Sequence, residues 1–214
     1  MPTIYGVFRS RASRPVWLMY EAGVPFEHVK VLQAYRLPAA AMEGVTLATD
    51  SPDFLAVNPQ GQIPAMKDGD LVLTESLGIV LHLARRYGGA LGPQDDAETA
   101  LMEQWALWAA TAVEGPALDI LMAPADETGA ATRAASAEKL RRPLARLAGH
   151  LSGQDWMIAR GFTAGDIVVA ECLRYAQGHP TLLGEFPVVK AWLERCQSRP
   201  AFRKMWAARM AEPA

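Results

Sequence analysis

Two short groups of residues between positions 62 and 76 have the types and spacing of a ligand-binding site. If the peptide bond between Ile63 and Pro64 is cis, Ile63 offers its N–H and C=O groups to a ligand that lies alongside as an added strand. Ser76 and the first N–H groups of a following helix bind an anion, whereas Glu75 binds an ammonium group. An α-amino acid carries both charges, so the pattern favours a small peptide with a free α-amino-carboxylate end.

Other reactive constellations are absent from the sequence. A Cys-x-x-Cys pair, which dithiol redox chemistry needs, does not occur, and neither does a Gly-x-Ser-x-Gly elbow or a phosphate-binding glycine loop. The histidines have no metal-ligand spacing, so no metal is expected, and His82 is expected to be a solvated surface residue. If the chain does chemistry, the bound ligand brings the reactive group. The four histidines are His28, His82, His150 and His179.

A β-hairpin and a helix must position the 62–76 region. Residues 64–67 and 71–74 form two apolar runs around Asp68-Gly69, a strong turn signal. Proline suits the start of a strand because it has no N–H group to donate. The apolar residues from Leu77 to Tyr87 then recur on one face of a helix.

The first 87 residues alternate between strand and helix patterns. Residues 3–8 and 26–31 are β-rich, and residues 14–21 are helical, with Ser13 as the candidate N-cap. An irregular, alanine-rich stretch covers residues 32–58. Together with the hairpin and its helix, these elements predict an α/β domain over residues 1–87.

A Gly/Pro-containing linker at 88–96 separates this domain from an all-helical one at 97–214. Thr163 and Asp166 form a capping-box pattern, with Phe162 and Ile167 in the positions of a hydrophobic staple. Apolar stripes predict three of the helices. These stripes are Leu101, Trp105, Trp108, Ala112 and Gly115; Leu140, Leu144, Leu147 and Leu151; and Val189, Trp192, Leu193 and Cys196.

Composition excludes several classes of protein. The net charge is −2 and half of the 214 residues are hydrophobic, so the chain has no basic footprint for nucleic acid. No apolar run reaches the ~20 residues that a membrane span needs, and the N-terminus does not have a signal-peptide pattern. Cys172 and Cys196 are expected to be buried, reduced thiols. We expect a cytoplasmic protein that does not bind membranes.

The chain resembles a glutathione transferase over nearly its whole length. "GQIPAM" at 61–66 is similar to the cis-proline turn of that family, and "LTES" at 73–76 is similar to its γ-glutamyl-binding junction. The order of domains and "FTAGD" at 162–166 agree with it. The resemblance implies a thioredoxin-like N-terminal domain, a helical C-terminal domain and glutathione as the co-substrate.

The same resemblance implies roles for individual residues. Ile63, with Pro64, would bind the cysteinyl backbone of glutathione, Glu75 and Ser76 its γ-glutamyl end, and Gln62 would help to position it. "VFRSRASRPVWL" at 7–18 resembles the serine-type theta and zeta classes and their bacterial relatives. Of two serines, Ser10 aligns with the catalytic serine, whereas Ser13 is explained as an N-cap. Arg11 either assists the thiolate or is a surface charge.

The family also implies a pocket for the electrophile between the domains and a homodimer. Trp108, Thr111, Gly115 and Leu118 share one helix face and are candidates to line the pocket, although plain helix packing explains them equally well.

Three functions are consistent with these residues. The first is conjugation of glutathione to small electrophiles. The second is a zeta-like, glutathione-dependent cis-trans isomerase of the maleylacetoacetate type, which "FRS" at 8–10 and Gln62 favour. Against it, Arg11 and Ala12 replace the serine and cysteine of that class, and Glu75 replaces its glutamine. The third is a non-enzymatic binding module, which retention of the binding residues argues against.

Overall fold

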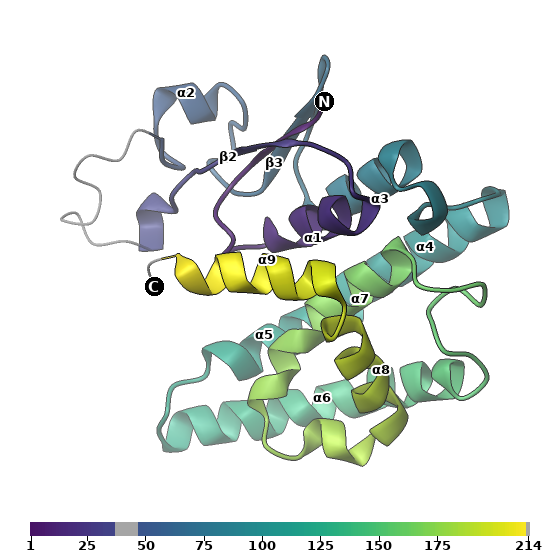
Figure 1. The fold of residues 1–214 in the computed structure, drawn as a ribbon. Coiled ribbons are helices and arrows are strands. Elements are labelled where there is room, and N and C mark those ends of the chain that lie inside the picture. Colours follow the sequence, from purple (N-terminus) through teal and green to yellow (C-terminus); the bar gives the residue numbers. More distant parts are fainter. Residues whose placement is uncertain (37–46, 213–214) are drawn as a thin grey trace. The chain divides into compact units, whose positions relative to one another are not determined.

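The computed structural model describes residues 1–36 and 47–212. The chain forms two compact units (Figure 1). The first contains Met1–Gly89 and the C-terminal segment from Pro200, and the second is Ala90–Arg199. The predicted division instead places all of 97–214 in the second domain. The last helix, α9 (Pro200–Ala211), joins the first unit because it packs against α1 (Ser13–Ala22).

A four-stranded mixed sheet in the order β2-β1-β3-β4 forms the centre of the first unit. Parallel pairing joins β1 (Thr3–Tyr5) to β2 (Glu27–Val29), and antiparallel pairing joins it to β3 (Ala65–Asp68). The edge strand beside β3 is β4 (Leu71–Leu73), and β2 forms the other edge. The α/β, thioredoxin-like prediction is therefore confirmed, although the first strand ends at Tyr5 and not at residue 8.

The two faces of the sheet are covered differently. Because side chains alternate along a strand, Ile4 and Met66 face one side and Tyr5 and Ala65 the other. On the first side lie α1 and α3 (Ser76–Tyr87), which pack against each other (Figure 1). On the second side, Phe54 of the short helix α2 (Pro52–Leu55) joins a buried apolar cluster. The predicted irregular stretch 32–58 thus contains α2 and a 3-10 turn at Ala34–Arg36, while its residues 37–46 lie outside the described residues.

The predicted hairpin is present, with its turn one residue later than expected. Asp68 pairs with Leu71, so Gly69, with φ 63°, and Asp70 form the turn. The Asp68 carboxylate accepts hydrogen bonds from His82 Nε2 at 3.0 Å and from Tyr87 Oη at 2.6 Å. Burial raises the pKa of Asp68, but these bonds and the charge of Arg86 outweigh it, so the pKa is lowered overall. The expectation that His82 is simply solvated is wrong, because it binds the hairpin to α3.

The second unit is helical, as predicted. Its helices are α4 (Asp96–Trp108), α5 (Gly115–Met122), α6 (Glu127–Leu151), α7 (Ala164–Leu173) and α8 (Pro187–Gln197). A π-helix, Ala109–Glu114, joins α4 to α5, and 3-10 turns occupy Gly89–Leu91, Arg174–Gly178 and Leu182–Glu185. None of the helices in the described chain is long and apolar enough to cross a membrane.

The predicted capping box at the start of α7 is confirmed. Asp166 is fully buried, and its carboxylate accepts hydrogen bonds from the main chain of Thr163 and Met157 and from Trp192 Nε1 at 2.9 Å each. Burial raises the pKa of Asp166 to about 6, against these hydrogen bonds, which lower it. One carboxylate thus connects the start of α7 to the loop before it and to α8.

Candidate functional site

A tight turn after β1 carries Ser10. Ser10 N donates to the Val7 carbonyl at 3.1 Å, which closes a four-residue turn over residues 7–10. The Ser10 hydroxyl donates to the same carbonyl at 2.7 Å and accepts from Ala12 N at 3.0 Å. Only 9% of Ser10 is exposed. Its oxygen therefore lies at the entrance to α1, where the N–H groups of a helix favour negative charge.

The prediction that Ser13 is the N-cap residue of α1 is wrong. Ala12 is the N-cap residue of α1, with helical dihedral angles, and Ser13 is already the first helical residue. The helix begins early because Ser10 provides the local turn: its main-chain oxygen accepts from Ser13 N, and its hydroxyl accepts from Ala12 N. Ser13 is fully buried. Ser10, the predicted catalytic serine, is thus the one that stabilises the start of the helix.

The turn before β3 presents the main chain of Ile63. The Ile63-Pro64 peptide is cis, as the sequence suggested. The buried side chain of Asn58, which sequence reasoning missed, organises the approach: it donates to the Gln62 carbonyl at 2.7 Å and accepts from Gln60 N. Pairing with β1 ends at Ala65, and none of the described turn or loop hydrogen bonds involves the Ile63 main chain. Those groups are therefore in position to pair with an extended ligand.

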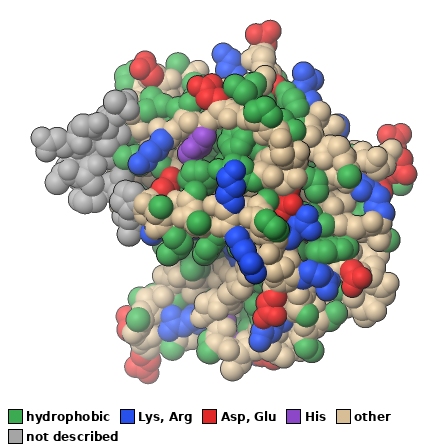
Figure 2. Space-filling view, viewed as in Figure 1, with side chains coloured by type: hydrophobic (Ala, Val, Ile, Leu, Met, Phe, Trp, Pro, Cys, Tyr) green, Lys and Arg blue, Asp and Glu red, His purple; other side chains and the backbone are tan. Residues whose placement is uncertain are grey.

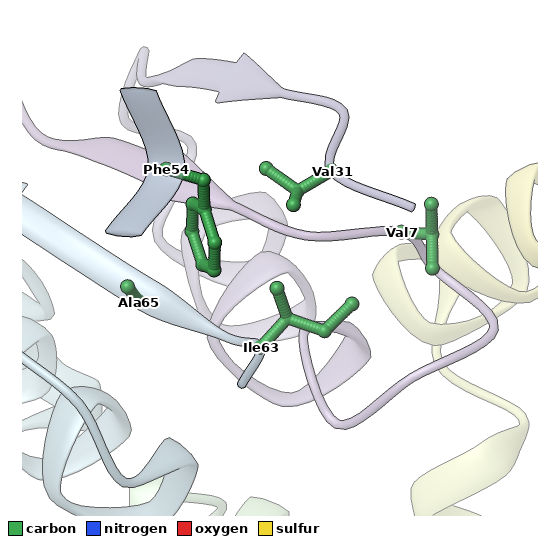
Figure 3. Packing of buried hydrophobic residues seen from close by; sticks show 5 residues of the cluster. All are labelled: Val7, Val31, Phe54, Ile63 and Ala65. Carbon is green, nitrogen blue, oxygen red and sulfur yellow. The ribbon is translucent and has the colours of Figure 1, made fainter. Parts of the chain in front are cut away.

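Apolar packing fixes the Ser10 turn and the Ile63 turn relative to each other. Figure 3 shows the side chains of Val7 and Ile63 in one buried cluster with Val31, Phe54 and Ala65. Gly6, with φ 143°, allows the two turns to approach each other closely. A Cβ at this position would lie 2.9 Å from Ala12 Cβ and 3.3 Å from Ile63 Cβ. The main chain of Ile63 and the entrance of α1 are thus held side by side.

The start of α3 has the features of an anion site. Ser76 is its first residue and is 5% exposed, and its hydroxyl accepts a hydrogen bond from Arg14 Nη1 at 2.9 Å. Glu75, just before it, is exposed and has φ 55°, a sparsely populated conformation for a residue with a side chain. Such conformations cluster at ligand sites. A hydroxyl, a helix N-terminus and a guanidinium therefore converge beside one exposed carboxylate.

Arg14 is a further candidate residue of this site, and sequence reasoning missed it. It is only 1% exposed and lies in the first turn of α1, where the helix dipole disfavours a cation. An acidic residue, Glu21, lies near the other end of α1, so both charges oppose the dipole. This arrangement costs helix stability but concentrates positive potential at the site. A basic residue in the first turn of an otherwise apolar helix face is the signal that identifies it.

The remaining predicted residues of the first unit are on its surface. Arg11 is exposed at the start of α1, and Gln62 is exposed just before Ile63. Both lie next to residues of the site in sequence. Their side chains are therefore accessible to a ligand, and their predicted contacts with glutathione stay predictions.

The four predicted pocket residues lie in the second unit, around the π-helix. The prediction assumed 3.6 residues per turn, but the π-helix between α4 and α5 changes the phase of the face. Trp108 is 9% exposed and packs edge-on against Trp105, with Arg146 over its ring. Thr111 and Gly115 are exposed, and Leu118 is half-buried.

Comparisons with known proteins identify the family. Residues 8–86 match the family model "Glutathione S-transferase, N-terminal domain", and residues 110–200 match the corresponding C-terminal domain. Glutathione S-transferase GstB of Escherichia coli K12 is 31% identical in an alignment of 160 residues that covers 72% of this chain and 77% of the relative. Glutathione S-transferase 3 of Zea mays is 34% identical over 209 residues, covering 91% and 88%.

Solved structures agree. A theta class glutathione S-transferase from Xanthomonas axonopodis pv. citri, crystallised with glutathione bound, is 32% identical with a TM-score of 0.79 and covers 95% of each chain. Glutathione transferase F7 of Populus trichocarpa is 26% identical with a TM-score of 0.80, covering 98% of this chain and 99% of that one. The chain belongs to the glutathione S-transferase family.

Proposed function

We propose that this protein is a glutathione transferase that activates the thiol of bound glutathione for attack on small electrophiles. The observation that carries the proposal is the buried Arg14–Ser76 pair beside Glu75 at the start of α3. The γ-glutamyl carboxylate binds Ser76, the helix N-terminus and the charge of Arg14, while the ammonium group binds Glu75. The cysteinyl main chain pairs with Ile63, and Pro64, Gln62 and Arg11 border it.

Ser10 stabilises the thiolate in this proposal. A thiol with a pKa near ~8.5 is only a few per cent ionised at neutral pH. A hydroxyl that donates to sulfur at a helix entrance favours the charged form. Ser10 has one proton, which it now donates to the Val7 carbonyl, so the hydroxyl rotates towards sulfur when glutathione binds.

The test is the thiolate absorbance of the glutathione complex against pH. Ser10→Ala is expected to raise the pKa of the bound thiol by about one to two units. Ser13→Ala, its matched control, is expected to leave that pKa unchanged. An unchanged pKa in Ser10→Ala would overturn the role of Ser10. Calorimetry with S-methyl glutathione, which has no ionisable thiol, separates thiol activation from binding. Turnover of glutathione with a model electrophile distinguishes an enzyme from a binding module.

Conjugation is preferred to isomerisation. Arg11, Ala12 and Glu75 depart from the zeta pattern. For the electrophile, the exposure of Thr111 and Gly115 supports their proposed place in the pocket. The aromatic packing of Trp108 gives it a supporting role there.

We further propose a homodimer in which the α/β half of each subunit packs against the helical half of its partner. Exposed apolar side chains support it: Leu71 and Val72 on the edge strand β4, and Leu101, Leu107 and Met122 on α4 and α5. Sedimentation at micromolar concentration is expected to show a species of twice the 23.2 kDa chain mass. A 23.2 kDa species alone would contradict the proposal.

The proposed compartment is the cytoplasm. Cys172 and Cys196 are buried and form no disulfide. This suits a reducing compartment that supplies glutathione. The face in Figure 2 carries charges of both signs among apolar side chains, which supports a partner other than nucleic acid.

A further inference from the structure

Two side chains at the C-terminal end of α9 hold a single peptide group in the Ser10 turn. Arg209 Nη1 donates a hydrogen bond to the Phe8 carbonyl. Glu212 Oε2 accepts a hydrogen bond from Arg9 N at 2.8 Å. The Phe8 carbonyl and the Arg9 N–H belong to the same peptide unit, and in a trans peptide they point in opposite directions. The cationic side chain of Arg209 and the anionic side chain of Glu212 therefore bind this peptide unit from opposite sides.

This peptide is the one whose orientation defines the turn. In the turn over residues 7–10, Phe8 and Arg9 are the two central residues. Rotating the peptide between the central residues converts a type I turn into a type II turn, which needs a positive φ at the second one. Arg9 does not have a positive φ. The contacts with Arg209 and Glu212 thus favour the present orientation, and with it the direction in which the chain enters Ser10.

Packing within the first unit fixes Arg209. Phe202 of α9 packs edge-on against Trp17 of α1, with ring centroids 4.9 Å apart. Trp206 stacks on Phe202, and the guanidinium of Arg209 lies over the Trp206 ring. These ring contacts hold the Arg209 side chain in the position from which it donates to the Phe8 carbonyl. The far side of the turn is also held, because His28 contacts the Phe8 ring and its Nε2 lies 2.6 Å from the Gly6 carbonyl.

We propose that Arg209 and Glu212 are positioning residues for Ser10. They do not touch the thiol themselves, but they hold the turn from which the Ser10 hydroxyl reaches sulfur. The inference rests on the proposed function, because it gives α9 a part in the activation of glutathione. It also assigns a catalytic contribution to a helix that the sequence places about 190 residues away from Ser10.

The experiment measures the pKa of the glutathione thiol in complexes with single variants. Arg209→Ala and Glu212→Ala are expected to raise the thiol pKa by about half to one unit, and to lower kcat about three- to tenfold at neutral pH. Glu212→Gln keeps the accepting oxygen and is expected to retain the wild-type pKa. Arg203→Ala, an exposed arginine on the same helix, is the matched control and is expected to change neither value.

Combination with Ser10→Ala separates the two proposals. When Ser10→Ala raises the thiol pKa, adding Arg209→Ala is expected to raise it no further, because the hydroxyl to be positioned is gone. Thermal denaturation checks that Arg209→Ala and Glu212→Ala are folded. If Ser10→Ala shifts the thiol pKa and both of these variants keep the wild-type value, the positioning role is overturned and the proposed function stands. If Ser10→Ala itself shifts nothing, the role of Ser10 fails and the positioning role with it.

Discussion

Replacing Ser76 by alanine tests the anion site and its energetics in one variant. The hydrogen bond from Arg14 Nη1 is 2.9 Å long and buried, since the two residues are 1% and 5% exposed. Removing a bond to a charged group costs about 1.5–3 kcal/mol. In a chain of this size each kcal/mol corresponds to about 2–4 °C in Tm, so Ser76→Ala is expected to lower Tm by about 3–12 °C.

The same substitution is expected to weaken glutathione binding about tenfold or more, because the ligand carboxylate loses one charge-assisted contact. Calorimetry measures the affinity and scanning fluorimetry the Tm. Ser76→Thr keeps the hydroxyl and is the matched control for both. In the double variant with Arg14→Met, the losses of stability are expected to fall short of additivity by about 0.5–3 kcal/mol, because both changes break one bond. Strict additivity, or wild-type affinity in Ser76→Ala, would refute the assignment.

Two further predictions concern buried groups away from the ligand. The pKa of Asp166 is raised from 3.8 to about 6 in the folded chain, so its contribution to stability is full below about pH 4 and is lost as pH rises through 6. Asp166→Asn abolishes this dependence. The difference in unfolding free energy between wild type and variant, measured in urea, is therefore expected to change by about 2.5 kcal/mol between pH 4 and 7. Parallel pH profiles would contradict this. Gly6→Ala places a Cβ against Ala12 and Ile63 and is expected to cost about 1–3 kcal/mol of stability and to weaken glutathione binding, whereas Gly149→Ala, with open space around it, is the tolerated control.

Local patterns predicted the parts of the site that local physics determines. The hairpin, the proline before its first strand and the polar pair before α3 all follow from turn chemistry and periodicity within a few residues. The capping box at Thr163 is a signal of the same kind, because its two partners are three residues apart.

The errors and omissions occur where distant contacts or irregular local turns determine the structure. The partner of Arg14 is 62 residues away, and no local pattern indicates it. Serine is a favoured N-cap residue, but the hydroxyl of Ser10 accepts from Ala12 N, and the helix begins at Ser13 itself. The face proposed for Trp108 assumed a regular helix, whereas a π-helix follows it directly. In each case tertiary packing or an irregular turn overrides a correct local propensity.

The membership of α9 in the first unit has a consequence for how the chain acquires its structure. The contacts between α1 and α9 close a loop of nearly the entire chain. The whole second unit lies in the sequence between the two segments that form the first unit. Contacts so distant in sequence form late, because closing the loop costs chain entropy before the contacts stabilise the fold. During synthesis, the whole second unit leaves the ribosome before the last helix does, because it precedes α9 in the sequence. The apolar surface of Trp17 is incompletely covered until Phe202 packs against it. The first unit is therefore the last to be completed, although it begins the chain.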